Sequence, residues 1–344
     1  MDTKVARIDP SNIDMAAIDA AALLIRAGEL VAFPTETVYG LGGDGLSIDA
    51  QAAIYAAKGR PLDNPLILHV SDFDMPHRLA HVSKNAEAVM RAFWPGPLTL
   101  TLPKREVLPD SLTCGLNSIA LRLPQNPIAR ALIAAAKTPI AAPSANTSGR
   151  PSPTLAAHVL EDLGGIIPMI LDGGACEVGV ESTVLDLSSE TPVILRPGAV
   201  THEMLTEILG DVEIFGDAVL AEADKPASPG MKYKHYAPRA AVTLVVGQAN
   251  EVTRKINELA AGATGKMAIL ATAQTAGCYS GYEVKVLGDR DKPETICTNL
   301  FAVLRECDTL GVDQIFAEGI KEDGVGVAIM NRLKKAAGYN ILQA

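Results

Sequence analysis

The sequence predicts an α/β protein of two domains, and three features point to this fold class. The chain has 344 residues, of which 48% are hydrophobic, so it is too long for one ordinary core and has ample apolar surface to bury. Short apolar runs typical of buried strands alternate with segments whose apolar residues recur at helical spacing. A stretch rich in proline and basic residues interrupts this alternation. We therefore expect a first domain at 1–215, a linker at 216–239 and a second domain at 240–344.

The first domain is expected to contain helices and strands around a central sheet. Gly28 suits the residue after a first helix, and Ser47 suits the N-cap of a second. The expected helices cover 14–27, 48–58, 84–93, 127–136, 154–163 and 201–209. The expected strands cover 30–33, 66–70, 98–102, 119–123, 139–142, 169–171, 183–187 and 193–195.

The second domain shows a cleaner alternation, which predicts a small doubly wound domain of Rossmann-like build. No G-x-G-x-x-G motif follows its first strand, and a fold by itself specifies no function. Its expected strands are 241–246, 267–271, 283–287 and 313–317, and its expected helices are 250–260, 294–308 and 326–337.

Composition narrows the class of protein. The net charge of −10 argues against a protein whose main task is to hold a nucleic-acid backbone. The five cysteines include no C-x-x-C pair, which favours a reducing compartment over a disulfide framework or a zinc site; Cys114 stands alone in a loop-like setting. Neither a signal sequence nor a long apolar run is present. We expect a cytoplasmic protein.

The segment 33–42 places a polar cluster directly after a buried strand, where α/β proteins build sites. It presents Thr35 and Thr37. Its glycines, together with Gly45, match the spacing G-x-G-x-x-G, but six residues separate the strand from the first of them. A dinucleotide loop needs its glycines in the turn itself, so this interpretation is disfavoured.

A second cluster follows the helix at 48–58. Lys58 and Arg60 end this helix, and Asn64 and His69 follow it. The two cations could simply complement the helix C-terminus. However, Arg60 lies between a glycine and a proline, and a rigid turn of this kind would aim its guanidinium at an anion such as a triphosphate.

Further polar residues lie at the ends of other strands. Arg122 ends an apolar strand that begins at Ser118, and a buried arginine should be paired or should bind an anion. Ser144 and Asn146 follow another strand and suit ligand binding, although turn chemistry is an equal explanation. Ser182 begins a strand and Arg196 ends the next, while no P-loop, H-E-x-x-H or G-x-S-x-G motif occurs.

Taken in order, these segments resemble the threonylcarbamoyl-AMP synthase family in its long form, a YrdC-like domain followed by a second domain. The resemblance covers essentially the whole chain and implies a twisted mixed sheet with a concave, positively lined cavity. It also implies that L-threonine, bicarbonate and ATP give threonylcarbamoyl-AMP and pyrophosphate, and that a separate transferase complex passes the product to tRNA. The matching segments are 34–42, 58–69, 118–124, 143–146, 181–183, 196–198 and the linker stretch 228–238.

The resemblance also implies roles for individual residues. Lys58 and Arg60 are expected to be catalytic, and Arg122 is expected to bind the threonine carboxylate. Mg²⁺ is expected to arrive with the ATP phosphates and to need no metal ligands from the chain. The linker is expected to close over the cavity as a lid. The residues expected at ATP are Lys58, Arg60, Asn64, Ser118, Ser144, Asn146, Ser152, Arg196, His235 and Tyr236. Those expected at threonine are Thr35, Thr37, His69, Arg122, Ala142 and Ser182.

Two other functions stay open at this point. The first is a YrdC-like module that binds RNA and does no chemistry, against which the net charge speaks. The second is a carbamoyl transferase or hydrolase that acts on carbamoyl phosphate and does not depend on threonine. No membrane partner and no strong direct binding of nucleic acid are expected.

Overall fold

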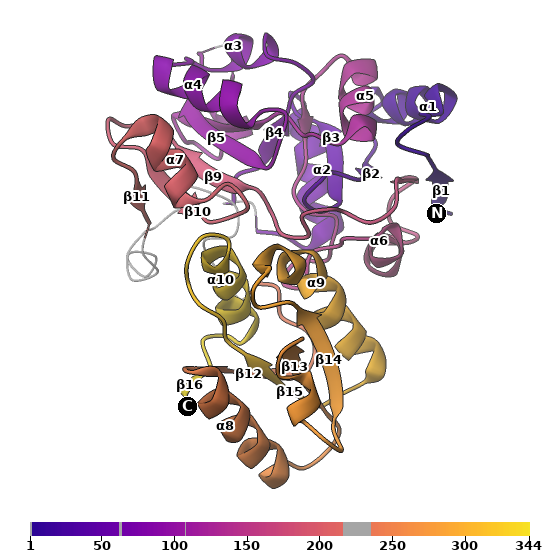
Figure 1. Ribbon diagram of the computed structural model, residues 1–344. Coiled ribbons are helices and arrows are strands. Elements are labelled where there is room, and N and C mark those ends of the chain that lie inside the picture. The colour runs from indigo at the N-terminus through magenta and orange to yellow at the C-terminus, as the bar shows by residue number, and fades with distance from the viewer. Residues whose placement is uncertain (1, 62–63, 107, 216–234) are drawn as a thin grey trace. The chain divides into compact units, whose positions relative to one another are not determined.

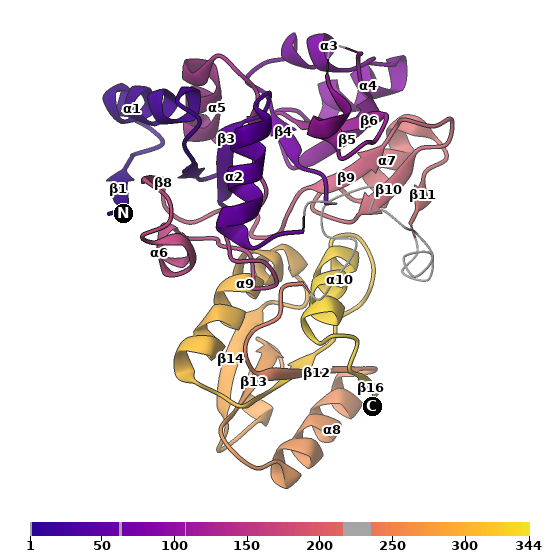
Figure 2. The same cartoon turned by 180° about the vertical axis from the view of Figure 1, so that it is seen from behind.

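The computed structural model describes residues 2–61, 64–106, 108–215 and 235–344. The chain forms two compact units (Figures 1 and 2). Their boundary falls inside the expected linker 216–239, most of which lies outside the described residues. Two short pieces from the residue range of the first unit, Gly149–Pro151 and Val178–Val180, belong to the second unit. Periodicity along the sequence did not predict this exchange.

The first unit is built on a mixed sheet whose described strands follow the order β1-β8-β2-β3-β7-β4-β6-β5-β9-β10-β11. The strands are β1 Lys4–Arg7, β2 Val31–Phe33, β3 Gly40–Asp44, β4 Ile67–His69, β5 Leu98–Pro103, β6 Ser118–Arg122, β7 Ile140–Ala141, β8 Met169–Asp172, β9 Thr183–Asp186, β10 Val193–Arg196 and β11 Glu213–Ile214. The helices are α1 Met15–Arg26, α2 Ile48–Lys58, α3 Met75–Leu79, α4 Lys84–Phe93, α5 Pro127–Ala136, α6 Ala156–Leu163 and α7 His202–Leu209, with a 3₁₀ turn at Asp110–Thr113.

The two faces of this sheet carry separate apolar cores, as the pleat of a strand requires. In β2, Val31 and Phe33 pack with α1 and α5 on one face, while Ala32 points into the larger core on the other. Helices α1 and α5 lie side by side over the first of these faces (Figure 1). The predicted helices recur with their caps: Ser47 Oγ accepts the N–H of Ala50, and α2 ends at the left-handed Gly59.

The strand β3 is the main departure from the predicted elements. No strand was predicted at these glycines, yet they pair antiparallel with β2, with Gly42 opposite Val31. A side chain at Gly42 would meet Phe33 Cε1 and Ile140 Cγ2, each 2.8 Å from an added Cβ. These glycines therefore serve close packing in a sheet and do not form a dinucleotide loop.

The second unit has a parallel sheet of order β14-β13-β15-β12-β16, which confirms the predicted Rossmann-like build. Among its described residues, no helix is long and apolar enough to cross a membrane, and the same holds for the described part of the first unit. The strands are β12 Ala241–Val246, β13 Met267–Thr272, β14 Glu283–Gly288, β15 Gln314–Glu318 and β16 Ile341–Gln343, and the helices are α8 Ala249–Gly262, α9 Pro293–Leu310 and α10 Gly326–Ala336.

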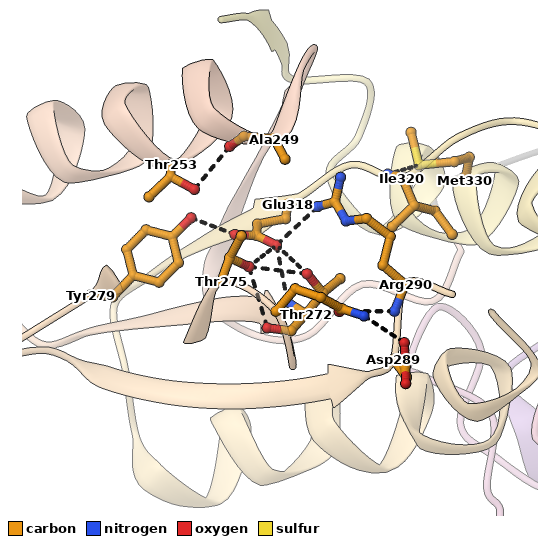
Figure 3. A network of polar contacts seen from close by, with 11 residues as sticks. Ala249, Thr253, Thr272, Thr275, Tyr279, Asp289, Arg290, Glu318, Ile320 and Met330 are labelled. Carbon is orange, nitrogen blue, oxygen red and sulfur yellow. Dashed lines mark hydrogen bonds and ion pairs between the residues drawn. The ribbon is translucent and has the colours of Figure 1, made fainter. Parts of the chain in front are cut away.

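A fully buried carboxylate ties together the carboxyl ends of this parallel sheet (Figure 3). Glu318, at the end of β15, accepts hydrogen bonds from the N–H and hydroxyl of Thr272, both at 3.0 Å, and from Thr275 Oγ1 at 2.7 Å. Tyr279 Oη donates to it at 2.5 Å and Arg290 Nη2 at 3.2 Å. Burial and the Glu318 carboxylate raise the pKa of Tyr279. The phenol therefore stays protonated and donates a hydrogen bond to Glu318. Because its oxygens are satisfied, Glu318 has a structural role.

Candidate functional site

A row of residues crosses the first unit's sheet on one face and includes the buried residues His69, Arg122 and Arg196. Register pairs join Ile140 of β7 to His69 of β4, and His69 to Arg122 of β6. A register pair also joins Thr99 of β5 to Val184 of β9. Arg196 of β10 pairs with Val184 just after a register shift, and its hydrogen bond to Ser182 Oγ, which contacts Thr99, places it next to the same row. Continuing the β5–β6 register by one residue from Leu100 and Leu121 brings Thr99 opposite Arg122. Because paired residues share a face, these side chains line one strip of the sheet.

Arg122 is held in one direction by a buried ion pair. Its Nη2 donates to Glu36 Oε1 at 2.7 Å, and both side chains are less than 5% exposed. Its Nε donates to the carbonyl of Gly96 at 3.3 Å, and Glu36 Oε2 accepts the N–H of Gln125 at 3.0 Å. Among the described residues Nη1 has no partner. One edge of the guanidinium therefore remains for an acidic ligand.

His69 is a neutral ring beside this guanidinium. Burial, together with the positive charge of Arg122, lowers its pKa from 6.5 to about 3. The His69 ring packs edge to face against the ring of Phe33, and the two ring centroids are 6.1 Å apart. No partner for Nδ1 occurs in the described part of the chain. A buried nitrogen without a partner marks a place where a ligand can complete the hydrogen bonding.

Thr35 and Thr37 form the turn after β2. Thr35 Oγ1 donates to the carbonyl of Val38 at 2.6 Å and accepts the backbone N–H groups of Thr37 and Val38 at 3.2 Å. The hydroxyl of Thr37 lies 2.9 Å from Thr35 Oγ1. The two hydroxyls thus stabilise the turn. This turn also carries Glu36, the partner of Arg122.

A second cluster lies around the end of α2. Lys58 is buried, and its Nζ donates to the carbonyls of Ser144 and Asn146, both at 2.5 Å. Ser144 Oγ donates to Asn146 Oδ1 at 2.5 Å, and Oδ1 also accepts from Lys58 at 3.3 Å. A solvated lysine that complements a helix end would not be buried in this way. Lys58 instead joins the helix to the Ser144–Asn146 turn.

The turn after α2 carries a buried amide. Arg60 Nη2 donates to the carbonyls of Asn64 and Pro65 at 3.4 and 3.3 Å, and Tyr55 Oη donates to that of Asn64 at 3.0 Å. The Asn64 side chain is 1% exposed, and neither Nδ2 nor Oδ1 has a partner in the described structure. An amide buried with both polar atoms open needs a polar ligand or water.

Ser182 and Arg196 meet at the start of β9. Arg196 Nε donates to the carbonyl of Ser182 at 3.1 Å, and its Nη2 donates to Ser182 Oγ at 3.2 Å. The other hydroxyl group in contact with Ser182 is that of Thr99, at 2.8 Å. This arrangement connects a residue predicted for ATP with a residue predicted for threonine.

Three further predicted residues lie near these clusters. Ser152 is fully buried and donates to Glu181 Oε1 at 2.5 Å. Ser118 begins β6 and lines a small pocket together with Thr101. Ala142 follows β7, and its N–H donates to the carbonyl of Ile67 at 3.0 Å.

His235 and Tyr236 belong to the second unit. The Tyr236 ring lies 5.2 Å from that of Phe301, and the guanidinium of Arg332 lies 5.6 Å from its centroid. The rest of the predicted lid, up to position 234, lies outside the described residues. The expected contact of His235 and Tyr236 with the nucleotide stays a prediction.

Two residues of this site were not found from the sequence. Glu36 stands inside the segment 33–42, and an acid among neutral residues next to a site was a signal that could have identified it. Thr99 lies in the alternating run at 98–102 and carries no signal of its own. Among the residues that the structure describes, no group of three or more His, Cys, Asp or Glu side chains could hold a metal ion.

Together the fold and the site define an α/β protein with a basic, ligand-binding strip on a mixed sheet. A family model described as telomere recombination matches residues 23–198, and one described as the C-terminal domain of threonylcarbamoyl-AMP synthase matches residues 200–338. The threonylcarbamoyl-AMP synthase of Pyrococcus abyssi is 49% identical over 330 residues, 95% of each chain. That of Bacillus subtilis is 46% identical over 95% of this chain and 94% of its own.

A solved structure supports the same relationship. The crystal structure of P. abyssi Sua5 complexed with L-threonine superposes with a TM-score of 0.93 at 46% identity, and covers 99% of this chain and all of the other. The chain therefore belongs to the threonylcarbamoyl-AMP synthase family and is an enzyme of threonylcarbamoyl-AMP synthesis. The predicted resemblance and the predicted fold class are confirmed.

Proposed function

We propose that the first unit is a nucleotidyltransferase that moves the adenylyl group of ATP onto a carbamate of L-threonine, with bicarbonate as the source of the carbamate carbon. The threonine amine attacks bicarbonate or CO₂, and water or a proton leaves. An oxygen of the carbamate then attacks the α-phosphorus of ATP, and pyrophosphate departs. Displacement of this kind depends on positioning and charge stabilisation more than on a covalent nucleophile.

The observation that carries this proposal is the pair of open nitrogens at His69 and Arg122. The two residues are buried register partners on neighbouring strands. His69 Nδ1 has no partner in the described structure, and the described hydrogen bonds of the Arg122 guanidinium use Nε and Nη2, so that Nη1 remains for a ligand. A small zwitterion with a carboxylate and a hydroxyl can satisfy both. L-threonine is such a molecule, and the P. abyssi relative was solved with it bound.

On the nucleotide side we assign the cations and amides around the second cluster. Arg60 and Arg196 would contact the phosphates, and Asn64 would use its open amide on the nucleotide. Lys58 would keep the Ser144–Asn146 turn in place and add positive charge. Ser118 and Ser152 would provide further hydrogen bonds.

Magnesium fits this site as a companion of ATP. The donors assigned to the phosphates are cationic or amide groups, which suit oxygen anions and do not suit a cation. Mg²⁺ usually keeps several waters and takes its remaining ligands from phosphates, so the nucleotide would bring it. Once bound, it would neutralise charge on the departing pyrophosphate.

The product would then pass to a separate transferase that modifies tRNA. The net charge of −10 supports this division of labour, because a chain that itself held the RNA would be expected to carry a basic face. The labile carbamate would need shielding from water during the reaction, and the linker 216–239, of which 216–234 lie outside the described residues, is proposed as the lid.

One assay tests the proposal: pyrophosphate release from ATP with L-threonine, with L-serine and with neither, each with and without bicarbonate. Release that requires both threonine and bicarbonate is expected, and Arg60→Ala should abolish it. Arg130→Ala, which removes an exposed arginine on α5, is the matched control and should behave as wild type. Release without threonine would support carbamoyl chemistry of another kind. RNA binding without any ATP turnover would support a binding module.

A further inference from the structure

Thr99 contacts the proposed threonine site from inside the sheet. It is fully buried in β5, and its hydroxyl has one hydrogen-bond partner in the described structure, Ser182 Oγ at 2.8 Å. Ser182 is fully buried as well.

The hydroxyls of Thr99 and Ser182 have more protons to donate than acceptors among the described residues. A hydroxyl has one proton and two lone pairs. Arg196 Nη2 already donates to Ser182 Oγ at 3.2 Å, and a guanidinium can only donate. The two hydroxyls therefore hold two protons and share one bond. Whichever of them donates in that bond, one buried proton has no acceptor among the described residues, so the missing partner must be an acceptor.

Position decides which proton is left over. Thr99 lies within β5, between β6 and β9, and its contact with Ser182 gives its proton a partner inside the sheet. Ser182 precedes β9 beside the guanidinium of Arg196, at the end of the strip. With Thr99 and Arg196 both donating to its oxygen, Ser182 has no lone pair free and can only donate outwards.

The acceptor is then expected close to Arg122. Continuing the β5–β6 register from Leu100 and Leu121 brings Thr99 opposite Arg122, whose Nη1 also lacks a described partner. Through Thr99, the register and the Thr99–Ser182 contact place these two donors close together. Two such donors, one of them cationic, suit a carboxylate and would repel an ammonium group.

We propose that Thr99 is a positioning residue that makes Ser182 an obligate hydrogen-bond donor to the carboxylate of bound L-threonine. This inference rests on the proposed threonine site. It adds a residue to that site and states which end of the amino acid meets Ser182.

The test is calorimetric binding to the full chain without ATP or bicarbonate. We expect Ser182→Ala to weaken L-threonine binding by about tenfold or more, the size of a lost hydrogen bond to a charged group. Thr99→Val should weaken it by roughly three- to tenfold, because the Ser182 hydroxyl loses its fixed orientation. Thr99→Ser, which keeps the hydroxyl, should restore binding. The double variant should bind no more weakly than Ser182→Ala alone, because Thr99 acts through Ser182.

L-threoninol, which keeps the ammonium and the hydroxyl but lacks the carboxylate, is the second ligand. Its affinity should be the same in wild type, Thr99→Val and Ser182→Ala. Trp94 fluorescence confirms that each variant is folded. If Thr99→Val does not fold, the affinities of Ser182→Ala for L-threonine and L-threoninol still show whether the Ser182 hydroxyl donates to the carboxylate.

Several results would overturn the inference. Additive losses in the double variant would show that Thr99 acts independently of Ser182. Equal losses for L-threonine and L-threoninol would place Ser182 at another part of the ligand. Unchanged L-threonine affinity in Ser182→Ala would count against the proposed threonine site itself, and so is distinguishable from a failure of the Thr99 role alone.

Discussion

Removing the carboxylate of Glu36 should destabilise the first unit strongly, because it leaves Arg122 buried without its charged partner. The two side chains are 3% and 4% exposed, and the bond joining them is 2.7 Å long. Breaking a buried pair by deleting one member costs about 3–5 kcal/mol. The N–H of Gln125, which donates to the other carboxylate oxygen, also loses its acceptor. We expect Glu36→Ala to lower the free energy of unfolding by about 4 kcal/mol.

The chain provides its own probe for this measurement. Trp94 is the single tryptophan of the sequence. It is buried, and its Nε1 donates to the carbonyl of Leu98 at 2.7 Å. It stands two residues before Gly96, whose carbonyl accepts from Arg122. Urea unfolding followed by its fluorescence therefore reports the first unit and the neighbourhood of the pair.

The matched control is Glu29→Ala, which removes an exposed acid from the same unit and should change stability by less than about 0.5 kcal/mol. If Glu36→Ala unfolds within about 0.5 kcal/mol of this control, the pair contributes nothing and the reasoning from burial is wrong.

Three further predictions follow from other contacts. Because the pKa of His69 is lowered from 6.5 to about 3, the unfolded chain binds a proton below pH 6.5 that the folded chain does not; stability should fall as the pH drops, by about 1 kcal/mol more in wild type than in His69→Gln between pH 7.5 and 5.5, and parallel urea profiles for the two proteins would contradict this. Glu318→Gln should place an N–H among donors and cost roughly 2–4 kcal/mol in the second unit; hydrogen exchange at the Thr272 amide should become faster, and unchanged protection would refute the structural role of the network. Gly42→Ala should force its Cβ against Phe33 and Ile140 and cost about 1–3 kcal/mol, and a Trp94 unfolding curve that matches wild type would show that the sheet relaxes around it.

The functional residues differ in how far the sequence could predict them. Lys58, Arg60, Arg122 and Arg196 could be predicted because a cation that follows an apolar helix or strand stands out locally. Glu36 and Thr99 were not predicted. The sequence marks Glu36 only as an acid among neutral residues, and Thr99 carries no signal of its own. The roles of both depend on partners 86 and 83 residues away, Arg122 and Ser182. A threonine in an alternating strand looks the same whether or not another hydroxyl faces it.

The same division holds for the fold. The helix at 48–58 was predicted with its bounds and with Ser47 as its N-cap, since caps and helical periodicity are local properties of the chain. The strand β3 was missed, because glycine has a low strand propensity and only the neighbours Phe33 and Ile140 explain why a side chain would not fit. The short strand β1 was also missed; it is defined mainly by its pairing with β8, far along the chain.

The sequence by itself thus determined the α/β fold class, most of the helices and strands and the enzyme family, and it named most of the polar residues of the candidate site. Tertiary structure alone decided the strip His69–Arg122–Thr99–Arg196, since strand register brings these residues side by side. It also decided the charge pairing of Arg122 and the neutrality of His69, because both depend on burial and on neighbours distant in sequence. Local chemistry can be read along the chain, whereas the direction of a hydrogen bond or the charge of a ring depends on which side chains the sheet brings together.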